Sequence, residues 1–254
     1  MQNSQQTLSQ NQIEAFYHDN FVESQVRDFI KLLGPAVDPS SGCVVDIGGG
    51  CGYFAKALLA TTPFKVRVLD TDMQSVTHCQ GEGIDAAHGD ALNPTIAGDE
   101  GVICFNLILH HLVGKSEAET SDLQRRALSA WHSKAPAIFV NEYIYESYGA
   151  AGFSGWLIYQ ITSNSALSKL GNLIAKILPS LKANTFGVGV RFRSHQEWKR
   201  MFESLGFNVV ATVTGKQEGV SLPRRMLLIK NCRRDSFLLK PKFAQVGTIR
   251  EGEQ

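Results

Sequence analysis

The stretch Val44–Gly52 reads VVDIGGGCG and decides the fold class of this 254-residue chain. Its apolar start is typical of a buried strand, and its glycines mark a turn at the end of that strand. Gly48, Gly50 and Gly52 have the spacing G-x-G-x-G, and a helical pattern begins at Gly52. Glycines let the backbone turn sharply and let a ligand come close without meeting a Cβ atom. The helix that follows offers free N–H groups and the positive end of its dipole, so the loop is predicted to bind a ligand.

Strands and helices alternate along the rest of the chain. Strands are expected at 44–47, 66–69, 102–109, 137–140, 208–213 and 225–229. Helices are expected at 13–33, 52–59, 121–131, 156–161, 167–178 and 194–205, the last opened by a capping box of Ser194 and Glu197. This alternation predicts βαβ units and a mostly parallel α/β sheet. The last two strands are joined by a connection too short for a crossover helix, so they are expected to pair antiparallel.

Acidic residues accompany the glycine loop at positions where a nucleotide-like cofactor needs them. Asp46 precedes the glycines, and Asp70 ends the next strand, where a carboxylate can accept hydrogen bonds from a ribose diol. Asp90 lies in a turn after that, where it could meet an adenine amino group. A nicotinamide cofactor is the alternative, but its G-x-G-x-x-G pattern needs a third glycine where this chain has Tyr53.

The spacing of these residues resembles the class I S-adenosylmethionine (SAM)-dependent methyltransferases, whose first motif reads acid-x-G-x-G-x-G. The resemblance covers roughly Val44 to Ile229. It implies a Rossmann-like, doubly wound sheet of seven strands with an antiparallel hairpin at one edge, and SAM as the cofactor. The cofactor residues that it implies are Asp46, Gly48, Gly50, Gly52, Asp70 and Asp90. The chain departs from the pattern at Phe105-Asn106, where the family commonly has Phe-Asp.

Two histidines and a glutamate are the candidate catalytic residues. His110 and His111 follow the strand 102–109, and ligands of open α/β sheets bind at the carboxyl ends of the strands. The segment before His110 also resembles the Leu-His segment of small-molecule O-methyltransferases, in which that histidine is the general base. In much of the wider family, a histidine here is not catalytic. Glu142 ends the next strand and could orient the histidine or bind a substrate amine. No acidic cluster follows these strands, so no metal is expected.

An insert at about 147–193 interrupts the βα pattern, and we interpret it as a helical cap. It contains no Asp or Glu, and Trp156 and Tyr159 are among its large apolar side chains. Arg191 and Arg193 share a face if their segment is extended, so both could hold one anion. These four residues are the candidate substrate-binding side chains, and they predict an anionic, partly apolar acceptor. The alternative is a lid whose basic side chains are merely solvated.

Composition and charge fit a single globular domain that spans 1–254. The chain is 43% hydrophobic, and its five scattered cysteines argue against a disulfide framework. No apolar run reaches the length of a membrane span and the N-terminus lacks signal-peptide features, so we expect a cytoplasmic protein. Residues 1–146 carry 9 Lys and Arg against 18 Asp and Glu, whereas residues 147–254 carry 16 against 6. This asymmetry suggests an acidic partner or substrate for the second half.

The sequence therefore predicts a SAM-dependent methyltransferase that acts on a small or carrier-bound acceptor. Oxygen is favoured over nitrogen or carbon as the methylated atom. One alternative is an RNA or protein methyltransferase that docks through its basic C-terminal half, although nucleic acid is the less favoured partner. Another is a non-catalytic partner subunit with the same fold. The sequence names neither the acceptor nor the oligomeric state.

Overall fold

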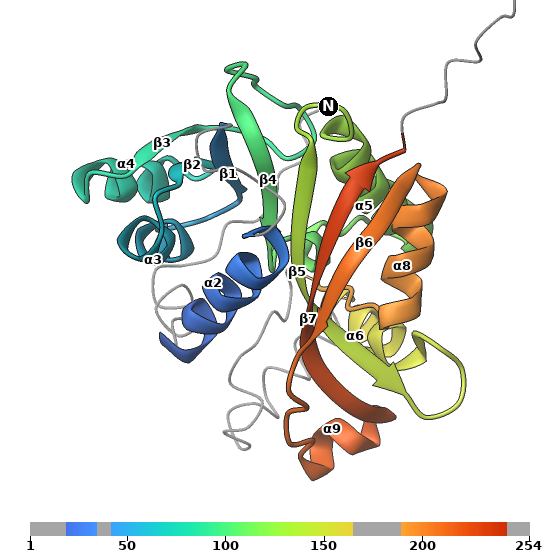
Figure 1. Cartoon of the computed structure of the whole chain (residues 1–254). Helices are drawn as coiled ribbons and strands as arrows, with labels where there is room; N and C mark the ends of the chain where they lie inside the picture. The colour runs from blue at the N-terminus through green and yellow to red at the C-terminus, as the bar shows by residue number, and fades with distance from the viewer. Residues whose placement is uncertain (1–18, 35–41, 165–188, 243–254) are drawn as a thin grey trace, which may run out of the picture.

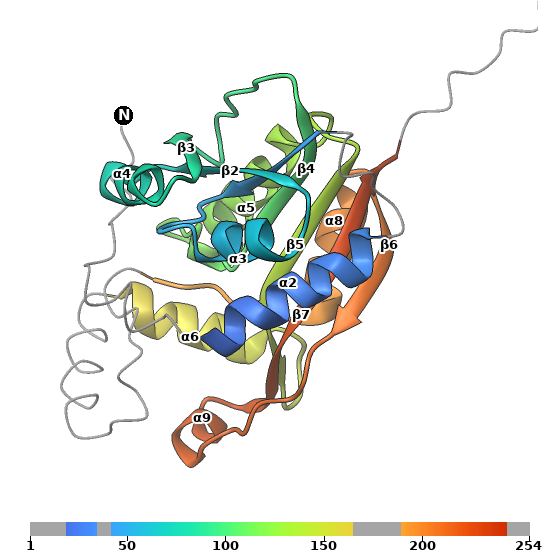
Figure 2. The same ribbon diagram turned by 60° about the vertical axis from the view of Figure 1, so that its left-hand side comes forward.

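The computed structural model describes residues 19–34, 42–164 and 189–242, which form one seven-stranded sheet with helices on both faces (Figures 1 and 2). The strands are β1 (Cys43–Ile47), β2 (Lys65–Asp70), β3 (Asp85–His88), β4 (Glu100–Asn106), β5 (Ala137–Ser147), β6 (Phe207–Thr214) and β7 (Ile229–Pro241). The helices are α2 (Asp19–Leu33), α3 (Tyr53–Thr61), α4 (Met73–Gly81), η2 (Leu109–His111), α5 (Glu117–Ala130), α6 (Phe153–Ser163), α8 (His195–Ser204) and α9 (Leu222–Met226).

The strand order β3-β2-β1-β4-β5-β7-β6 reverses direction between β1 and β4. These two strands are parallel, as are β2 and β3 on one side and β5 on the other. The register aligns Ile47 with both Leu69 and Phe105, so three strands end at one level. The reversal creates a crevice at their carboxyl ends, where open α/β sheets bind ligands. Strand β7 pairs antiparallel with β5 and β6, which confirms the predicted edge hairpin.

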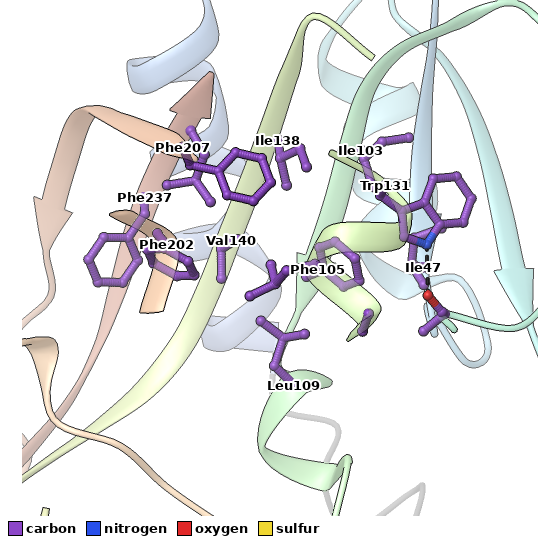
Figure 3. Close-up of a cluster of buried hydrophobic side chains, with 14 of the residues drawn as sticks. Ile47, Ile103, Phe105, Leu109, Trp131, Ile138, Val140, Phe202, Phe207 and Phe237 are labelled. Carbon is purple, nitrogen blue, oxygen red and sulfur yellow. Dashed lines mark hydrogen bonds between the residues drawn. The ribbon is translucent and has the colours of Figure 1, made fainter. Parts of the chain in front are cut away.

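Aromatic side chains fill the core on each face of the sheet. Helices α2 and α3 cover one face, where Phe29 makes edge-on contacts with Phe54, Phe64 and Phe139. Helices α5 and α8 cover the other face, and Figure 3 shows the cluster of buried side chains beneath them. Strand β1 is buried throughout, as expected of a central parallel strand covered on both faces. Burial on both faces holds the carboxyl ends of β1 and β4 rigidly in place.

The structure corrects several predicted elements. The predicted strand 225–229 is instead the short helix α9 followed by the start of β7, because Pro223 falls at a helix start, where its ring fits. Strand β4 ends at Asn106, so the last part of the predicted 102–109 strand turns into η2. Strand β3 and helix α4 were not expected. The capping box of Ser194 and Glu197 at the start of α8 is confirmed.

Strand β5 continues beyond the level at which its parallel neighbour ends. Asn106 of β4 pairs with Asn141, and the part of β5 beyond this pair has β7 on one side. The chain that returns from the cap lies on the other side, where the N–H of Tyr145 donates to the carbonyl of Arg193. The structure describes residues 147–164 and 189–193 of the predicted cap, so the predicted helix 167–178 lies outside the described residues.

Helix α2 confirms the described part of the predicted N-terminal helix 13–33, and residues 13–18 lie outside the described part of the chain. In the described ranges, no helix is both long enough and apolar enough to cross a membrane.

Candidate active site

The glycine loop joins β1 to α3 and adopts a backbone that glycine alone accommodates easily. Gly48, Gly50 and Gly52 all have positive φ, at 66°, 54° and 73°. A Cβ atom on Gly50 would meet nothing within 4 Å, so open space adjoins this residue. A Cβ atom on Gly52 would instead come within 2.8 Å of the Sγ atom of Cys79. Gly50 therefore leaves room for a ligand, whereas Gly52 is required by backbone conformation and packing.

Asp70 ends β2 with its carboxylate held beside the loop. Its Oδ2 atom accepts a 2.8 Å hydrogen bond from the N–H of Gly50, and its Oδ1 atom accepts a 2.8 Å bond from the N–H of Asp72. These two backbone donors fix the orientation of the carboxylate. Each oxygen still has a lone pair for a further donor. Asp70 can therefore accept two ligand hydroxyl groups without rearrangement.

A pocket of about 370 Å³, counting the open space at its mouth, lies at the carboxyl ends of these strands. Carboxylates and a hydroxyl contribute its polar atoms, and aliphatic side chains contribute its apolar ones. Its lining consists of Gly48, Asp70, Thr71, Gly89, Asp90, Ala91, Ile108 and Leu112. The combination suits a ligand with a polar sugar and a flat, largely apolar base.

Asp90 lines this pocket, but its carboxylate is also used within its own turn. Its Oδ1 atom accepts from the N–H of Leu92 at 2.9 Å, and its Oδ2 atom accepts from the side-chain amide of Asn93 at 2.7 Å. The indole N–H of Trp131 donates to the carbonyl of Ala91 at 2.9 Å, the dashed contact in Figure 3. The turn is thus anchored from the core, and a ligand amino group would have to share the oxygens of Asp90.

Asp46 lies beneath the glycine loop and is not among the residues that line the pocket. It is 1% exposed, and its Oδ1 atom accepts a 2.9 Å hydrogen bond from the amide of Asn106. Its Oδ2 atom faces Gly49 and has no hydrogen-bond partner among the described residues. Burial raises the pKa of Asp46 to about 7, partly offset by the bond from Asn106. The predicted role of Asp46 towards the cofactor is therefore at most indirect, in that Asp46 supports the glycine loop from below.

His110 and Glu142, both predicted as catalytic residues, are hydrogen-bonded to each other. The Nδ1 atom of His110 lies 2.7 Å from the Oε2 atom of Glu142, and Glu142 is fully buried. The other carboxylate oxygen accepts a 2.7 Å bond from the N–H of Leu109. A carboxylate in this position makes Nδ1 the protonated nitrogen, which leaves Nε2 with a free lone pair. The pair therefore has the arrangement of a general base with its orienting carboxylate.

In the sequence, His110 lies between Ile108 and Leu112, and both of these residues line the pocket. Just before them, Leu107 has a left-handed backbone with φ of 56°, which is costly for a side chain branched like leucine. The backbone is thus strained where β4 turns into η2, and this turn directs the histidine side chains towards the cap.

His111 has a different environment from its neighbour. The two imidazole rings lie 4.2 Å apart, and the ring of His110 also stacks on Phe192 at 4.9 Å. Burial and, to a smaller extent, the adjacent His110 lower the pKa of His111 well below its usual value. His111 therefore stays neutral at physiological pH, and no carboxylate is seen to orient it in the described residues.

Gln124 supports the turn that carries His110 and was not found by the sequence analysis. It is fully buried in α5, where its side-chain amide donates to the carbonyl of Leu109 at 3.0 Å. Its carbonyl oxygen accepts a 2.6 Å bond from the Nε atom of Arg193. A buried glutamine in an amphipathic helix gives a weak sequence signal, since the same residue type is common on exposed helix faces.

The Gln124→Leu variant tests this support. It removes the donor to Leu109 and the acceptor of Arg193, and each buried group left unpaired costs about 1–3 kcal/mol. We expect a lower urea midpoint, a kcat lowered about ten-fold by misplacement of His110, and an unchanged KM for SAM. Gln124→Glu keeps the acceptor for Arg193 and should recover part of the stability. A normal kcat in Gln124→Leu would mean that Glu142 alone positions the turn.

The structure does not support the predicted anion clamp of Arg191 and Arg193. Both side chains are about 5% exposed and already pair with Glu117 and Glu197. The Nε atom of Arg191 donates to Glu117 at 2.8 Å, and Arg193 bonds Gln124 and the same Glu117. Their charges are thus neutralised within the protein. They join the chain returning from the cap to α5 and α8 instead of facing a ligand.

The two aromatic residues predicted to bind substrate have separate environments on α6. Tyr159 is 2% exposed, and its hydroxyl donates to the carbonyl of Gly114 at 2.8 Å. Trp156 is 37% exposed, and its ring contacts that of Phe153. Tyr159 therefore fixes α6 to the loop after η2, and of the two only Trp156 offers a surface to a ligand.

Within residues 19–34, 42–164 and 189–242, no three His, Cys, Asp or Glu side chains are grouped so that they could hold a metal ion.

Comparisons with known proteins identify the fold. No family model and no curated protein sequence matches the chain. A SAM-dependent methyltransferase from Clostridium acetobutylicum superposes with a TM-score of 0.56 at 11% identity, covering 91% of this chain and 95% of that one. Magnesium protoporphyrin IX methyltransferase from Synechocystis, with bound S-adenosylhomocysteine, gives 0.52 at 13% identity, covering 93% and 90%.

A third similar structure is the mitomycin 7-O-methyltransferase MmcR, with a TM-score of 0.51 and 16% identity. The match covers 87% of this chain but only 53% of MmcR, so the chain spans about half the length of that protein. All three superpose on most of this chain and differ widely from it in sequence. The chain has the fold of the class I SAM-dependent methyltransferases.

Proposed function

We propose that this protein is a SAM-dependent methyltransferase that methylates an oxygen of a small or carrier-bound acceptor. The observation that carries the proposal is the buried pair of His110 and Glu142, because His110 lies in the turn whose residues Ile108 and Leu112 line the glycine-loop pocket. A fold alone does not establish an activity, but a histidine with an orienting carboxylate, in a turn that lines a pocket at the glycine loop, supports one.

The residues of the pocket fit SAM in three ways. Asp70 offers two fixed carboxylate oxygens to a ribose diol. The open space at Gly50 and the start of α3 suit the methionine carboxylate, because a helix N-terminus favours an anion. Ile108 and Leu112 suit the flat face of adenine. When bound, SAM supplies a methyl group on a positively charged sulfur.

The protein's own contribution is to remove a proton and to hold the acceptor in line. With Nδ1–H donated to Glu142, the Nε2 atom of His110 would accept the proton that an acceptor hydroxyl gives up when its oxygen is methylated. The imidazolium that forms is stabilised by the buried carboxylate. His110 is 4% exposed, whereas His111 and Phe192 beside it are partly exposed.

We do not propose that the acceptor is anionic. Arg191 and Arg193 were the reason to expect an anion, and both are neutralised by glutamates. The proposed base supports oxygen as the methylated atom of the acceptor. A neutral hydroxyl must lose its proton during attack, whereas many amines need not. The similarity to an O-methyltransferase, MmcR, is consistent with it but shows only the fold.

The Asp70→Ala variant tests cofactor binding. We expect SAM and S-adenosylhomocysteine to bind about 1.5–3 kcal/mol more weakly, because the hydrogen bonds to a charged acceptor are lost. Isothermal titration calorimetry measures the change. Asp85→Ala is the matched control, since Asp85 lies on the neighbouring strand β3 and bonds Arg67 outside the pocket. Unchanged affinity in Asp70→Ala would contradict the cofactor assignment.

A further inference from the structure

The short helix α9 presents the most exposed large hydrophobic side chains among the described residues. Leu222 is 77% exposed and Met226 is 82% exposed. Helix α9 lies at the far end of the β5–β7 arm, away from the body of the sheet, in both views (Figures 1 and 2). Side chains this apolar are costly to leave in water, and together on a protruding element they indicate a contact surface.

Neighbouring residues extend this surface beyond the helix. Leu228 follows α9 and is 41% exposed, and its carbonyl accepts a hydrogen bond from the N–H of Tyr148, which is 52% exposed. Arg225 is exposed on α9 itself. We call these five residues the α9 patch: Tyr148, Leu222, Arg225, Met226 and Leu228.

Most of the charges near the α9 patch are positive. Residues 148–164 contain no charged residue. Residues 215–232 contain Lys216, Arg224, Arg225 and Lys230, and the single acid among them, Glu218, is only half exposed. The partner of such a surface must therefore be apolar and negatively charged.

We propose that the α9 patch docks the protein on the surface of an anionic lipid bilayer. Leu222 and Met226 would enter the boundary of the acyl chains, while Tyr148 would lie at the level of the headgroups, where aromatic residues concentrate. Arg225 would pair with lipid phosphates. Aliphatic tips, an aromatic ring and cations on one protruding element match the layers of a bilayer interface.

The position of the α9 patch relative to the candidate base supports this partner. Leu227 of the α9 segment and Phe192 pack against the same small cluster around Tyr145, and Phe192 stacks on His110. Docking through α9 would thus bring the acceptor side of the site towards the membrane. In that respect the inference rests on the proposed function, and it implies that an apolar acceptor is taken from the bilayer.

Vesicle co-sedimentation of the full chain tests the docking without any enzymatic assay. The probes are vesicles of phosphatidylcholine alone and of phosphatidylcholine mixed with phosphatidylglycerol, at low and high salt. We expect binding to the mixed vesicles only, weakened by salt. The double variant Arg224→Gln/Arg225→Gln should bind about 30-fold more weakly, since each basic residue near anionic lipid contributes about five-fold. Leu222→Ser/Met226→Ser should lose about ten-fold or more.

Two control variants carry the same changes at exposed sites elsewhere on the molecule. Arg126→Gln/Lys134→Gln matches the charge change, and Ile96→Ser/Val210→Ser matches the apolar change. Both should bind like the wild type, and thermal unfolding checks that each variant is folded. Three outcomes would overturn the proposal: no binding to anionic vesicles, equal binding by the α9 variants, or a wild-type dimer that Leu222→Ser/Met226→Ser dissociates. Loss of SAM turnover with intact vesicle binding would overturn the proposed function and leave the docking standing.

Discussion

Replacing His110 with alanine should lower kcat by about 10²–10⁴-fold while leaving the affinity for SAM unchanged, because the base touches the acceptor and not the cofactor. The buried hydrogen bond from its Nδ1 atom to Glu142 is the reason to propose His110 as the base, since an oriented imidazole presents Nε2 in a fixed direction. Single-turnover kinetics with an accepted hydroxyl compound, beside calorimetry with SAM, separates the two effects.

The neighbouring residues provide the controls for this result. Glu142→Gln keeps the shape of the side chain but removes its charge, so it should also lower kcat, by less than the loss of the base itself. His111→Ala should have a much smaller effect, because no carboxylate among the described residues orients that ring. A large loss for His111→Ala with near-normal turnover of His110→Ala would identify the other histidine as the base. Normal rates in both variants would mean that positioning alone is sufficient.

The Asp46→Asn variant should be more stable than the wild type at neutral and alkaline pH, by up to about 4 kcal/mol. The pKa of Asp46 is about 7 in the folded protein and close to 3.8 when the chain is unfolded. Between these values the folded state holds a proton that the unfolded state has released, so wild-type stability falls as pH rises through this window. Asparagine is never ionised, so it avoids this loss. Below about pH 4 the two proteins should be equally stable.

Urea unfolding at several pH values between 4 and 8 measures this difference. Asp122→Asn is the control, because Asp122 is exposed on α5 and its removal should leave the wild-type pH profile unchanged. If Asp46→Asn follows the wild-type profile across the range, then the buried Oδ2 atom has a partner that stabilises its charge. That result would point to a donor beneath Gly49 which the described residues do not supply.

Local sequence patterns predicted the elements around the glycine loop well. The strand, the glycine loop and the acid at the end of β2 are contiguous or separated by one βα unit, and their geometry follows from that unit alone. The pairing of β6 with β7 was predicted for a similar reason, because a short connection permits only an antiparallel neighbour. The boundary of α9 was missed, since Pro223 supports either a turn or a helix start.

The geometry of the part of the site that is proposed to bind the acceptor depends on contacts between distant parts of the chain. His110 and Glu142 were both selected from strand ends, but only the pairing of β4 with β5 brings their side chains together. Arg191 and Arg193 were expected to bind an anion because the insert that contains them, 147–193, has no Asp or Glu. Glu117, more than 70 residues earlier, neutralises both in the folded protein.

The sequence by itself thus determined the fold class and the cofactor loop, because both depend on residue periodicity and on backbone freedom within a few residues. The tertiary structure decided which polar groups are paired. It buried Gln124 against the catalytic turn and Asp46 beneath the loop, and it placed two arginines against glutamates. Hydrogen bonds and ion pairs act over only a few ångströms, so which groups meet is set by strand order and helix packing and not by distance along the chain.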